Sequence, residues 1–167
     1  MSLNPHPSVS QLCAQLAATL LERRLKLATA ESCTGGQIAA ACTDLAGSSA
    51  WFERGMVTYS NDAKTEMLGV DAALIMLHGA VSEAVVRAMV QGAIHHSHAQ
   101  IALAVTGVAG PGGGSKNKPV GTVWFGWSVG GQVSSEVCRF GGDRAAVRAA
   151  TVAHALRHLL TLLGPAG

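Results

Sequence analysis

The segment 30–36 (Ala-Glu-Ser-Cys-Thr-Gly-Gly) brings a serine, a cysteine and a threonine together with two glycines. Apolar residues on either side, at 27–29 and 38–42, predict a strand, a tight turn and a helix. The first N–H groups of a helix lack partners and carry a partial positive charge. Ser32 at such a corner suits a nucleophile whose attack creates an oxyanion, or a group that binds an anion.

Two other interpretations of this segment stay open. Ser and Thr are common helix N-caps, so the turn could have a structural role alone. Cys33 follows Ser32 directly in the chain and is therefore a rival nucleophile.

Lys64 and His78 are the candidate bases for a serine nucleophile. A lysine that is partly desolvated beside a serine loses proton affinity and can accept the hydroxyl proton. Tyr59, the only tyrosine, precedes Lys64 across a predicted turn between a strand and a helix. His78 competes because Ser–His pairs are common in acyl-transfer enzymes, although its place before Gly79 also fits a helix C-terminus.

Glycines and arginines further along the chain could hold an anion. The glycine-rich segment 106–119 matches neither the P-loop nor the dinucleotide fingerprint, because Ser115 stands where each pattern requires a glycine. Two interpretations of this segment stay open: a nest of backbone N–H groups that binds an anion, or a long surface loop. Arg144 and Arg148 lie one turn apart on a predicted helix, where they could hold a phosphate or carboxylate or simply be solvated.

Hydrophobic periodicity and turn residues indicate how these segments are positioned. The predicted helices cover 8–24, 36–43, 64–68, 72–77, 82–97 and 143–163, and the predicted strands cover 25–30, 55–60, 100–105, 120–128 and 132–140. This order predicts an α/β fold, a three-layer α/β/α sandwich with a mixed β-sheet that ends in a hairpin at Gly130-Gly131. Loops at the carboxyl ends of parallel strands converge, so we expect 32–36, 59–64 and 106–118 to share one site.

Composition limits the class of protein. The 167 residues fit one domain, 1–167, of which residues 1–7 are expected to form a flexible tail. A net charge of +2 does not favour nucleic acid as a partner, and no segment has the pattern of a signal peptide or a membrane span. The four cysteines lack zinc-ligand spacing, so we expect a reduced cytoplasmic protein without a metal site. The histidines at His95, His96 and His98 are interpreted as a solvated helix end.

We also expect a homo-oligomer, most simply a symmetric dimer. Charged residues make up only 13% of the chain, and the predicted strand at 124–128 carries large apolar side chains on both faces. Trp51 and Phe52 follow a loop and have no obvious partner within the chain. A second subunit could cover this apolar surface.

Several of these segments, taken in chain order, resemble the CinA C-terminal domain family. The matching blocks span nearly the whole chain and lie at 30–36, 47–52, 57–64, 78–82, 106–113, 118–123 and 142–144. The chain is similar to the stand-alone form, without the extra N-terminal domain of some relatives. Asn117 departs from the pattern, because relatives often carry an acidic residue in this loop.

The resemblance implies the three-layer fold and an activity. The activity of the family is hydrolysis of the carboxamide of nicotinamide mononucleotide, which gives nicotinate mononucleotide and ammonia in pyridine nucleotide recycling. The matching positions imply Ser32 as the nucleophile, completed by Tyr59 and Lys64, with no metal or organic cofactor. A nucleotide-binding or regulatory domain of the same fold without turnover is the alternative, which the presence of all three residues disfavours.

Hydrolysis of an amide needs a nucleophile, a base, donors for the oxyanion and a proton for the departing ammonia. Neutral Lys64 would take the proton of Ser32, and Tyr59 would relay or donate one. The ribose phosphate would supply remote binding energy that orients the amide. The predicted substrate-binding residues are Cys33, Thr34, Gly35 and Gly36, around the oxyanion, and Thr106, Gly107 and Arg144, around the phosphate.

Overall fold

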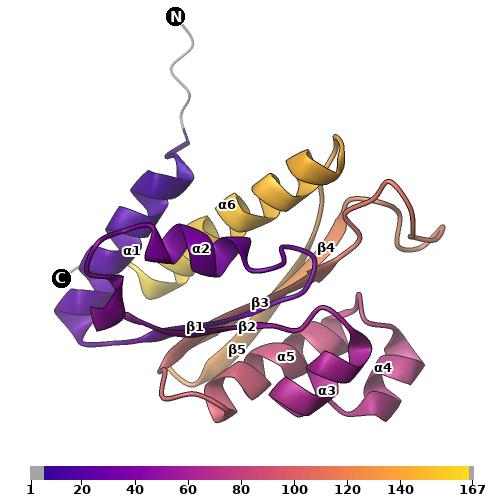
Figure 1. Ribbon diagram of the computed structural model, residues 1–167, viewed down its shortest axis with the longest axis horizontal. Helices are drawn as coiled ribbons and strands as arrows, with labels where there is room; N and C mark the ends of the chain where they lie inside the picture. The colour runs from indigo at the N-terminus through magenta and orange to yellow at the C-terminus, as the bar shows by residue number, and fades with distance from the viewer. Residues whose placement is uncertain (1–5, 166–167) are drawn as a thin grey trace, which may run out of the picture.

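A five-stranded mixed sheet forms the middle layer of the protein (Figure 1). Its strands, in spatial order, are β2 (Phe52–Val57), β1 (Leu27–Glu31), β3 (Ile101–Gly107), β4 (Thr122–Val129) and β5 (Gln132–Arg139). β1 pairs in parallel with both β2 and β3, whereas β3, β4 and β5 are antiparallel neighbours. The sequence-based prediction of a mixed sheet ending in a hairpin is confirmed.

Helices cover both faces of this sheet, which confirms the predicted three-layer α/β/α arrangement (Figure 1). One face carries α1 (Val9–Arg23), α2 (Gln37–Thr43) and α6 (Arg144–Leu163), and the other carries α3 (Asn61–Leu68), α4 (Ala72–His78) and α5 (Glu83–His95). This computed structural model describes residues 6–165, so residues 1–5 of the predicted tail lie outside the described part of the chain. No helix of the described residues is both long and apolar enough to cross a membrane.

The two faces of the central strands differ in side-chain size. On β3, Leu103 and Val105 belong to the apolar cluster shared with α1 and α6, whereas Ala102 and Ala104 belong to the cluster shared with α5. Small residues on the second face allow α5 to lie close to the sheet. The strand predicted at 100–105 is confirmed, and residues 101–106 of β3 are buried on both faces.

A glycine brings α3 against α5, and α3 in turn carries Lys64. A Cβ atom added to Gly92 on α5 would lie 2.1 Å from the carbonyl oxygen of Leu68 at the end of α3. No side chain fits at that separation, so the close packing of these two helices requires glycine at this position. The position of Lys64 relative to the sheet depends on this contact.

β2 begins earlier in the chain than the predicted strand at 55–60. Ser60 is the N-cap of α3, where its side chain accepts a hydrogen bond from the N–H of Ala63 at 3.0 Å, so the strand cannot continue there. The sequence did not predict the first residues of β2, because Glu53 and Arg54 are charged and charged residues are rare in strand interiors.

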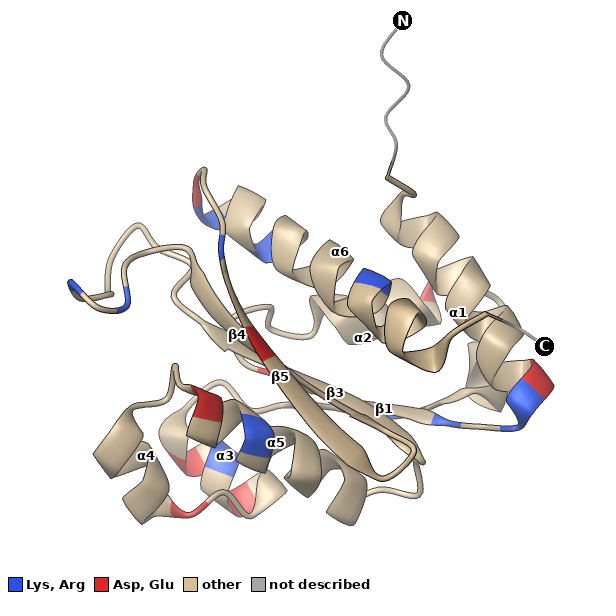
Figure 2. Cartoon of the chain, turned by 180° about the vertical axis from the view of Figure 1, so that it is seen from behind, with Lys and Arg blue, Asp and Glu red and all other residues tan. Residues whose placement is uncertain are grey.

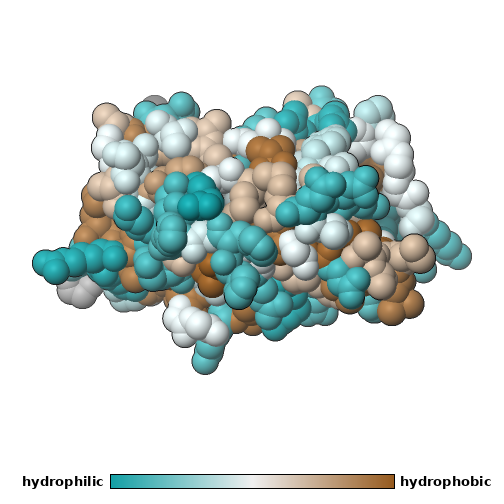
Figure 3. Space-filling model, turned by 60° about the horizontal axis from the view of Figure 1, so that its bottom comes forward, coloured by the Kyte–Doolittle hydropathy of each residue, from teal (hydrophilic) through white to brown (hydrophobic). Residues whose placement is uncertain are grey.

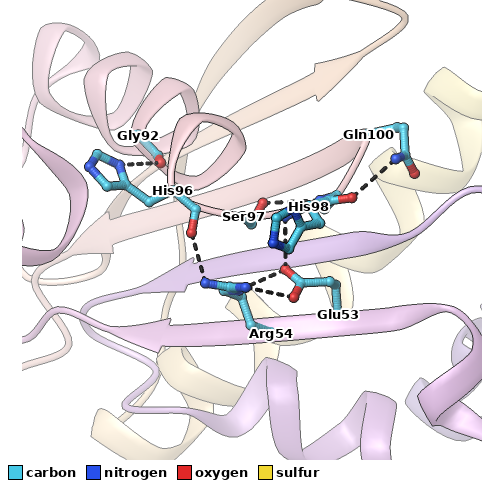
Figure 4. Close-up of polar contacts among 8 residues, drawn as sticks. Glu53, Arg54, Gly92, His96, Ser97, His98 and Gln100 are labelled. Carbon is cyan, nitrogen blue, oxygen red and sulfur yellow. Dashed lines mark hydrogen bonds and ion pairs between the residues drawn. The ribbon is translucent and has the colours of Figure 1, made fainter.

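The charged pair at the start of β2 binds the turn between α5 and β3 (Figure 4). Arg54 donates to both carboxylate oxygens of Glu53 and to the carbonyl oxygen of His96 at 2.9 Å. Glu53 also accepts a hydrogen bond from the backbone N–H of His98 at 3.2 Å. The backbone of the histidine-rich turn is thus fixed to the edge strand.

The aromatic residues that suggested a subunit interface are covered by the chain itself. Trp51 is 1% exposed and lies in the apolar cluster of α1 and α6, so the prediction that it has no partner within the chain is wrong. Phe52 packs partly against the same cluster. Phe125 and Trp127 face α6 while Trp124 faces α5, as the alternation predicted.

The homo-oligomer stays a prediction, although the burial of Trp51 removes one argument for it. Among the large hydrophobic residues within 6–165, Met76 and Leu77 on α4 are the most exposed, at 87% and 77%. Figure 3 shows the face that carries α3, α4 and α5, where apolar patches are separated by hydrophilic residues. Charged residues are few and scattered over the fold (Figure 2).

Candidate active site

The carboxyl ends of the three parallel strands meet around one cavity of about 230 Å³. Ser32 and Cys33 follow β1, Tyr59 and Lys64 follow β2, and Thr106 lies near the end of β3. The sequence predicted this convergence of three loops. The other residues that line the cavity are Asn61, Ala80, Val81, Gly107, Ala109 and Arg144.

Lys64 and Ser32 form the centre of the site. The Nζ atom of Lys64 lies 3.0 Å from the Oγ atom of Ser32, 2.9 Å from the carbonyl oxygen of Thr58 and 3.3 Å from that of Tyr59. Lys64 Nζ donates to all three oxygens in this arrangement. Because a hydroxyl can also donate, the same partners accommodate a neutral amine, with two N–H groups on the carbonyl oxygens and its lone pair facing the Ser32 hydroxyl.

Burial lowers the pKa of Lys64 below its ordinary value of 10.5, because removal from water disfavours the charged amine. Its side chain is 1% exposed, and no carboxylate within residues 6–165 forms an ion pair with it. A lysine in this state can accept a proton from a neighbouring hydroxyl.

Cys33, the rival nucleophile, is a poor candidate in this environment. The pKa of its thiol is raised to about 11, mainly by burial and in part by the negative charge of Glu31. Because the thiolate is the reactive form of cysteine, the thiol of Cys33 is inert near neutral pH.

Glu31 fixes the turn that carries Ser32. Its carboxylate is fully buried and accepts hydrogen bonds from the Thr34 hydroxyl at 2.6 Å and from the N–H groups of Ile38 and Ala39 at 2.8 and 3.0 Å. The side chain at the end of β1 thus pairs the free N–H groups at the start of α2. Sequence reasoning missed this role, although a carboxylate between a buried strand and a helix start was the available signal.

Three of the predicted substrate-binding residues do not line the cavity. Thr34 is fully buried and donates to Glu31, while Gly35 and Gly36 form the turn with φ values of 59° and 102°. Positive φ values of this kind favour glycine. The structure therefore gives Thr34, Gly35 and Gly36 a structural role, and their contact with a substrate stays a prediction.

Arg148 supports the same turn from α6. Its Nε and Nη2 atoms donate to the carbonyl oxygens of Cys33 and Thr34, each at 3.1 Å. The sequence suggested this arginine as an anion ligand, but two of its donors are engaged with the protein backbone.

Arg144 lies at the rim of the cavity together with Tyr59. Its guanidinium donates to the carbonyl oxygen of Gly110 at 2.9 Å and to the hydroxyl of Tyr59 at 3.0 Å. Tyr59 is 58% exposed, and no hydrogen bond within residues 6–165 joins its hydroxyl to Ser32 or Lys64. The hydroxyl of Tyr59 therefore belongs to the entrance, while its carbonyl contacts Lys64.

A second cavity of about 470 Å³ adjoins the first and shares Ala109 and Arg144 with it. It is lined by the glycine-rich loop between β3 and β4 and by the start of α6. The base of this loop is closed by hydrogen bonds from Val108 N to Thr122 O at 2.9 Å and from Gly121 N to Val108 O at 2.7 Å. A ligand with two parts could occupy both cavities, with Arg144 between them.

The remaining predicted residues divide into two groups. Thr106 and Gly107 line the cavity, and the Thr106 hydroxyl donates to the carbonyl oxygen of Ala80 at 2.9 Å. His78, the competing base, is exposed and is absent from the cavity wall, and its carbonyl oxygen accepts a hydrogen bond from Lys118. The structure brings Lys64, and not His78, to Ser32.

Comparison with known proteins gives a consistent family. The profile described as the CinA C-terminal domain matches residues 9–163. A Pseudomonas putida protein named nicotinamide-nucleotide amidohydrolase PncC is 54% identical over 154 residues, which is 92% of this chain and 96% of that protein. An Escherichia coli (strain K12) protein of the same name is 51% identical over 151 residues, which is 89% of this chain and 91% of that protein. The crystal structure of competence/damage inducible protein CihA from Agrobacterium tumefaciens is 45% identical with a TM-score of 0.92, and covers 98% of this chain and 100% of that chain.

We predict that Glu31→Ala lowers the free energy of unfolding by at least about 2 kcal/mol, because each buried donor left unpaired costs roughly 1–3 kcal/mol. Urea denaturation measures the change. Glu66→Ala on the exposed face of α3 is the matched control, and should change stability by less than about 0.5 kcal/mol. Equal effects of the two substitutions would contradict a role for Glu31 in fixing the turn.

Proposed function

The chain belongs to the CinA C-terminal domain family, and we propose that it hydrolyses the carboxamide of nicotinamide mononucleotide to nicotinate mononucleotide and ammonia. Two relatives that match about nine-tenths of the chain are named nicotinamide-nucleotide amidohydrolases. The observation that carries the proposal is the buried contact of 3.0 Å between Lys64 Nζ and Ser32 Oγ. Release of ammonia from nicotinamide mononucleotide by the purified protein tests it, and absence of turnover would favour a silent nucleotide-binding domain.

In the proposed first step, neutral Lys64 takes the proton of Ser32 while the Ser32 oxygen attacks the carboxamide carbon. Cys33 is the residue of the turn 33–36 that lines the cavity, and its backbone N–H would stabilise the oxyanion. The C–N bond then breaks, and protonated Lys64 returns its proton to the departing nitrogen, which leaves as ammonia.

In the proposed second step, a water molecule attacks the nicotinoyl ester and Lys64 takes one of its protons. The ester bond to Ser32 breaks, Lys64 returns the proton to the serine oxygen, and the carboxylate product leaves. Tyr59 supports both steps from the rim, since its carbonyl oxygen holds Lys64 and its hydroxyl binds Arg144. The Tyr59 hydroxyl would relay a proton only after the substrate has displaced Arg144 from it.

The ribose phosphate would extend from the catalytic cavity into the adjoining cavity. Arg144 lies at the junction and carries a planar set of donors that suits a phosphate. Binding energy from this remote group would orient the carboxamide over Ser32. Thr106 and Gly107 would contact the part of the nucleotide nearest to the sheet.

Three further proposals accompany the activity. The enzyme would recycle pyridine nucleotides in the cytoplasm and would act as a homo-oligomer, most simply a dimer. The exposed apolar side chains on α4 support the last of these.

We predict that Ser32→Ala reduces kcat for ammonia release by at least a thousandfold, because the nucleophile is removed while the fold is kept. Cys33→Ala should retain activity within about tenfold, since the buried thiol takes no part in bond formation. Steady-state ammonia release measures both variants. If Cys33→Ala is inactive while Ser32→Ala is active, the nucleophile is Cys33.

The lowered pKa of Lys64 predicts a pH profile with a definite sign. The base is active when neutral, so kcat should fall as pH falls through the pKa of Lys64 and level off above it. The midpoint should lie below the ordinary lysine value of 10.5, because burial disfavours the charged form.

Lys64→Met should cost about a hundredfold or more in kcat, whereas Lys116→Met in the exposed loop and His78→Gln should not.

We predict that Arg144→Ala weakens the binding of nicotinamide mononucleotide much more than that of nicotinamide riboside, which lacks the phosphate. The ratio of kcat/KM for the two substrates should fall by about tenfold or more, in line with loss of a charged hydrogen bond of roughly 1.5–3 kcal/mol. Arg139→Ala on β5, an exposed arginine that lines neither cavity, is the matched control and should leave both substrates unchanged. Equal losses for both substrates in Arg144→Ala would remove this residue from phosphate binding.

A further inference from the structure

We propose that Glu136, Cys138 and His154 form a binding site for a zinc ion between β5 and α6. The site lies outside the catalytic cavity and does not depend on the proposed function. β5 is an edge strand of the sheet, and Figure 2 shows α6 lying over one face of the sheet. Within residues 6–165, these three are the one group of histidine, cysteine and acidic side chains whose ligand atoms gather in this way.

The sequence positions place the donors on facing surfaces. Glu136 and Cys138 are two residues apart on a strand, so their side chains point to the same face. They lie opposite Phe125 and Val123 of β4, on the face of the sheet that α6 covers. His154 belongs to α6 and therefore approaches the pair from above the sheet.

The distances between the three ligand atoms resemble those around a bound zinc ion. The Nε2 atom of His154 lies 3.0 Å from Oε2 of Glu136 and 3.5 Å from Sγ of Cys138, and the three donor atoms lie within 4.8 Å of one another. A tetrahedral zinc ion with Zn–S about 2.3 Å and Zn–N about 2.0 Å separates these ligand atoms by about 3.5 Å. An ion can therefore enter with small side-chain movements.

The donor types select zinc among common divalent ions. Calcium and magnesium prefer oxygen ligands only, whereas a thiolate and an imidazole together favour zinc. A fourth ligand is available one helical turn along, because Nδ1 of His158 lies 3.8 Å from Oε2 of Glu136. Water can take this place instead, since the Glu136 side chain is 41% exposed.

The surroundings hold the imidazole of His154 in a fixed orientation. Its ring contacts that of Phe125 with centroids 4.7 Å apart, and that of Phe140 with centroids 6.2 Å apart. The His154 side chain is 22% exposed, so its metal-binding edge is shielded but reachable from solvent. Such a partly apolar setting restricts the number of water ligands that an ion can keep.

Zinc at this position would bind an edge strand to the helix that supports the active-site turn. His154 is six residues beyond Arg148 on α6, or about 9 Å along the helix axis. The ion would hold β5 against α6 as a structural link. It would contribute no ligand or charge to the cavity around Ser32.

The test uses the full-length protein without a histidine tag, stripped of metal by a chelator. Titration with Zn²⁺ in a calorimeter should show one equivalent bound, and bound Zn²⁺ should raise the melting temperature. Substitution with Co²⁺ should give the absorption band of charge transfer from sulfur to cobalt. This band reports a thiolate ligand directly and requires no variant protein.

Variants then assign the ligands. Cys138→Ser and His154→Gln should each weaken Zn²⁺ binding at least tenfold. The Co²⁺ form of Cys138→Ser should also lack the cobalt–sulfur band. Circular dichroism checks that both variants are folded. The control protein carries His95→Gln and His98→Gln in the exposed histidine-rich turn, and should bind as the parent does. The proposal is overturned if the parent binds no Zn²⁺, if its Co²⁺ form lacks the sulfur band, or if only the control protein loses binding.

Discussion

The buried carboxylate of Glu31 joins three elements of the fold at one residue. Its side chain pairs the N–H groups at the start of α2, and its carbonyl oxygen accepts a hydrogen bond from Thr58 N at the end of β2 at 2.8 Å. The carbonyl of Thr58 in turn accepts from Lys64, whose amine meets Ser32, the residue next to Glu31. These hydrogen bonds, closed by the peptide bond between Glu31 and Ser32, fix the separation between the amine and the hydroxyl. The circuit passes through the backbone carbonyl of Glu31, while the carboxylate of the same residue holds the turn.

The second requirement of the site is removal of an amine from water. Burial of a lysine without an ion pair is costly, and a protein tolerates it where the surrounding packing determines the position. Here α3 is pressed against α5 through Gly92, and the sheet closes the remaining side. The three-layer architecture thus lowers the proton affinity of Lys64, because a lysine on the surface of the same helix would keep its ordinary value.

Local patterns were sufficient to predict the elements and the place where they meet. The apolar periodicities, the predicted helix starts at 82 and 143 and the glycine pair of the hairpin act within a few residues. The structure confirms them, with Ser82 and Asp143 as the N-caps of α5 and α6. The contacts that complete the site join distant positions. Arg148 reaches Cys33 across most of the chain, and Trp51 is buried by helices at both ends of it. Neither contact follows from composition or spacing, so the sequence suggested an anion ligand in the first case and an intermolecular surface in the second.

The sheet changes from parallel to antiparallel pairing at β3, and this has an evolutionary consequence. Because β4 starts at the edge of the sheet where β3 ends, the loop between them leaves and returns beside the cavity around Ser32. Its base is held by backbone hydrogen bonds between Val108, Gly121 and Thr122, which do not depend on side chains or on loop length. Residues can therefore be inserted or lost at the loop tip without shifting strand register. Descendants of this fold can remodel the wall of the adjoining cavity while the contact between Ser32 and Lys64 stays in place, so the shape of that cavity can diverge faster than the geometry of this pair.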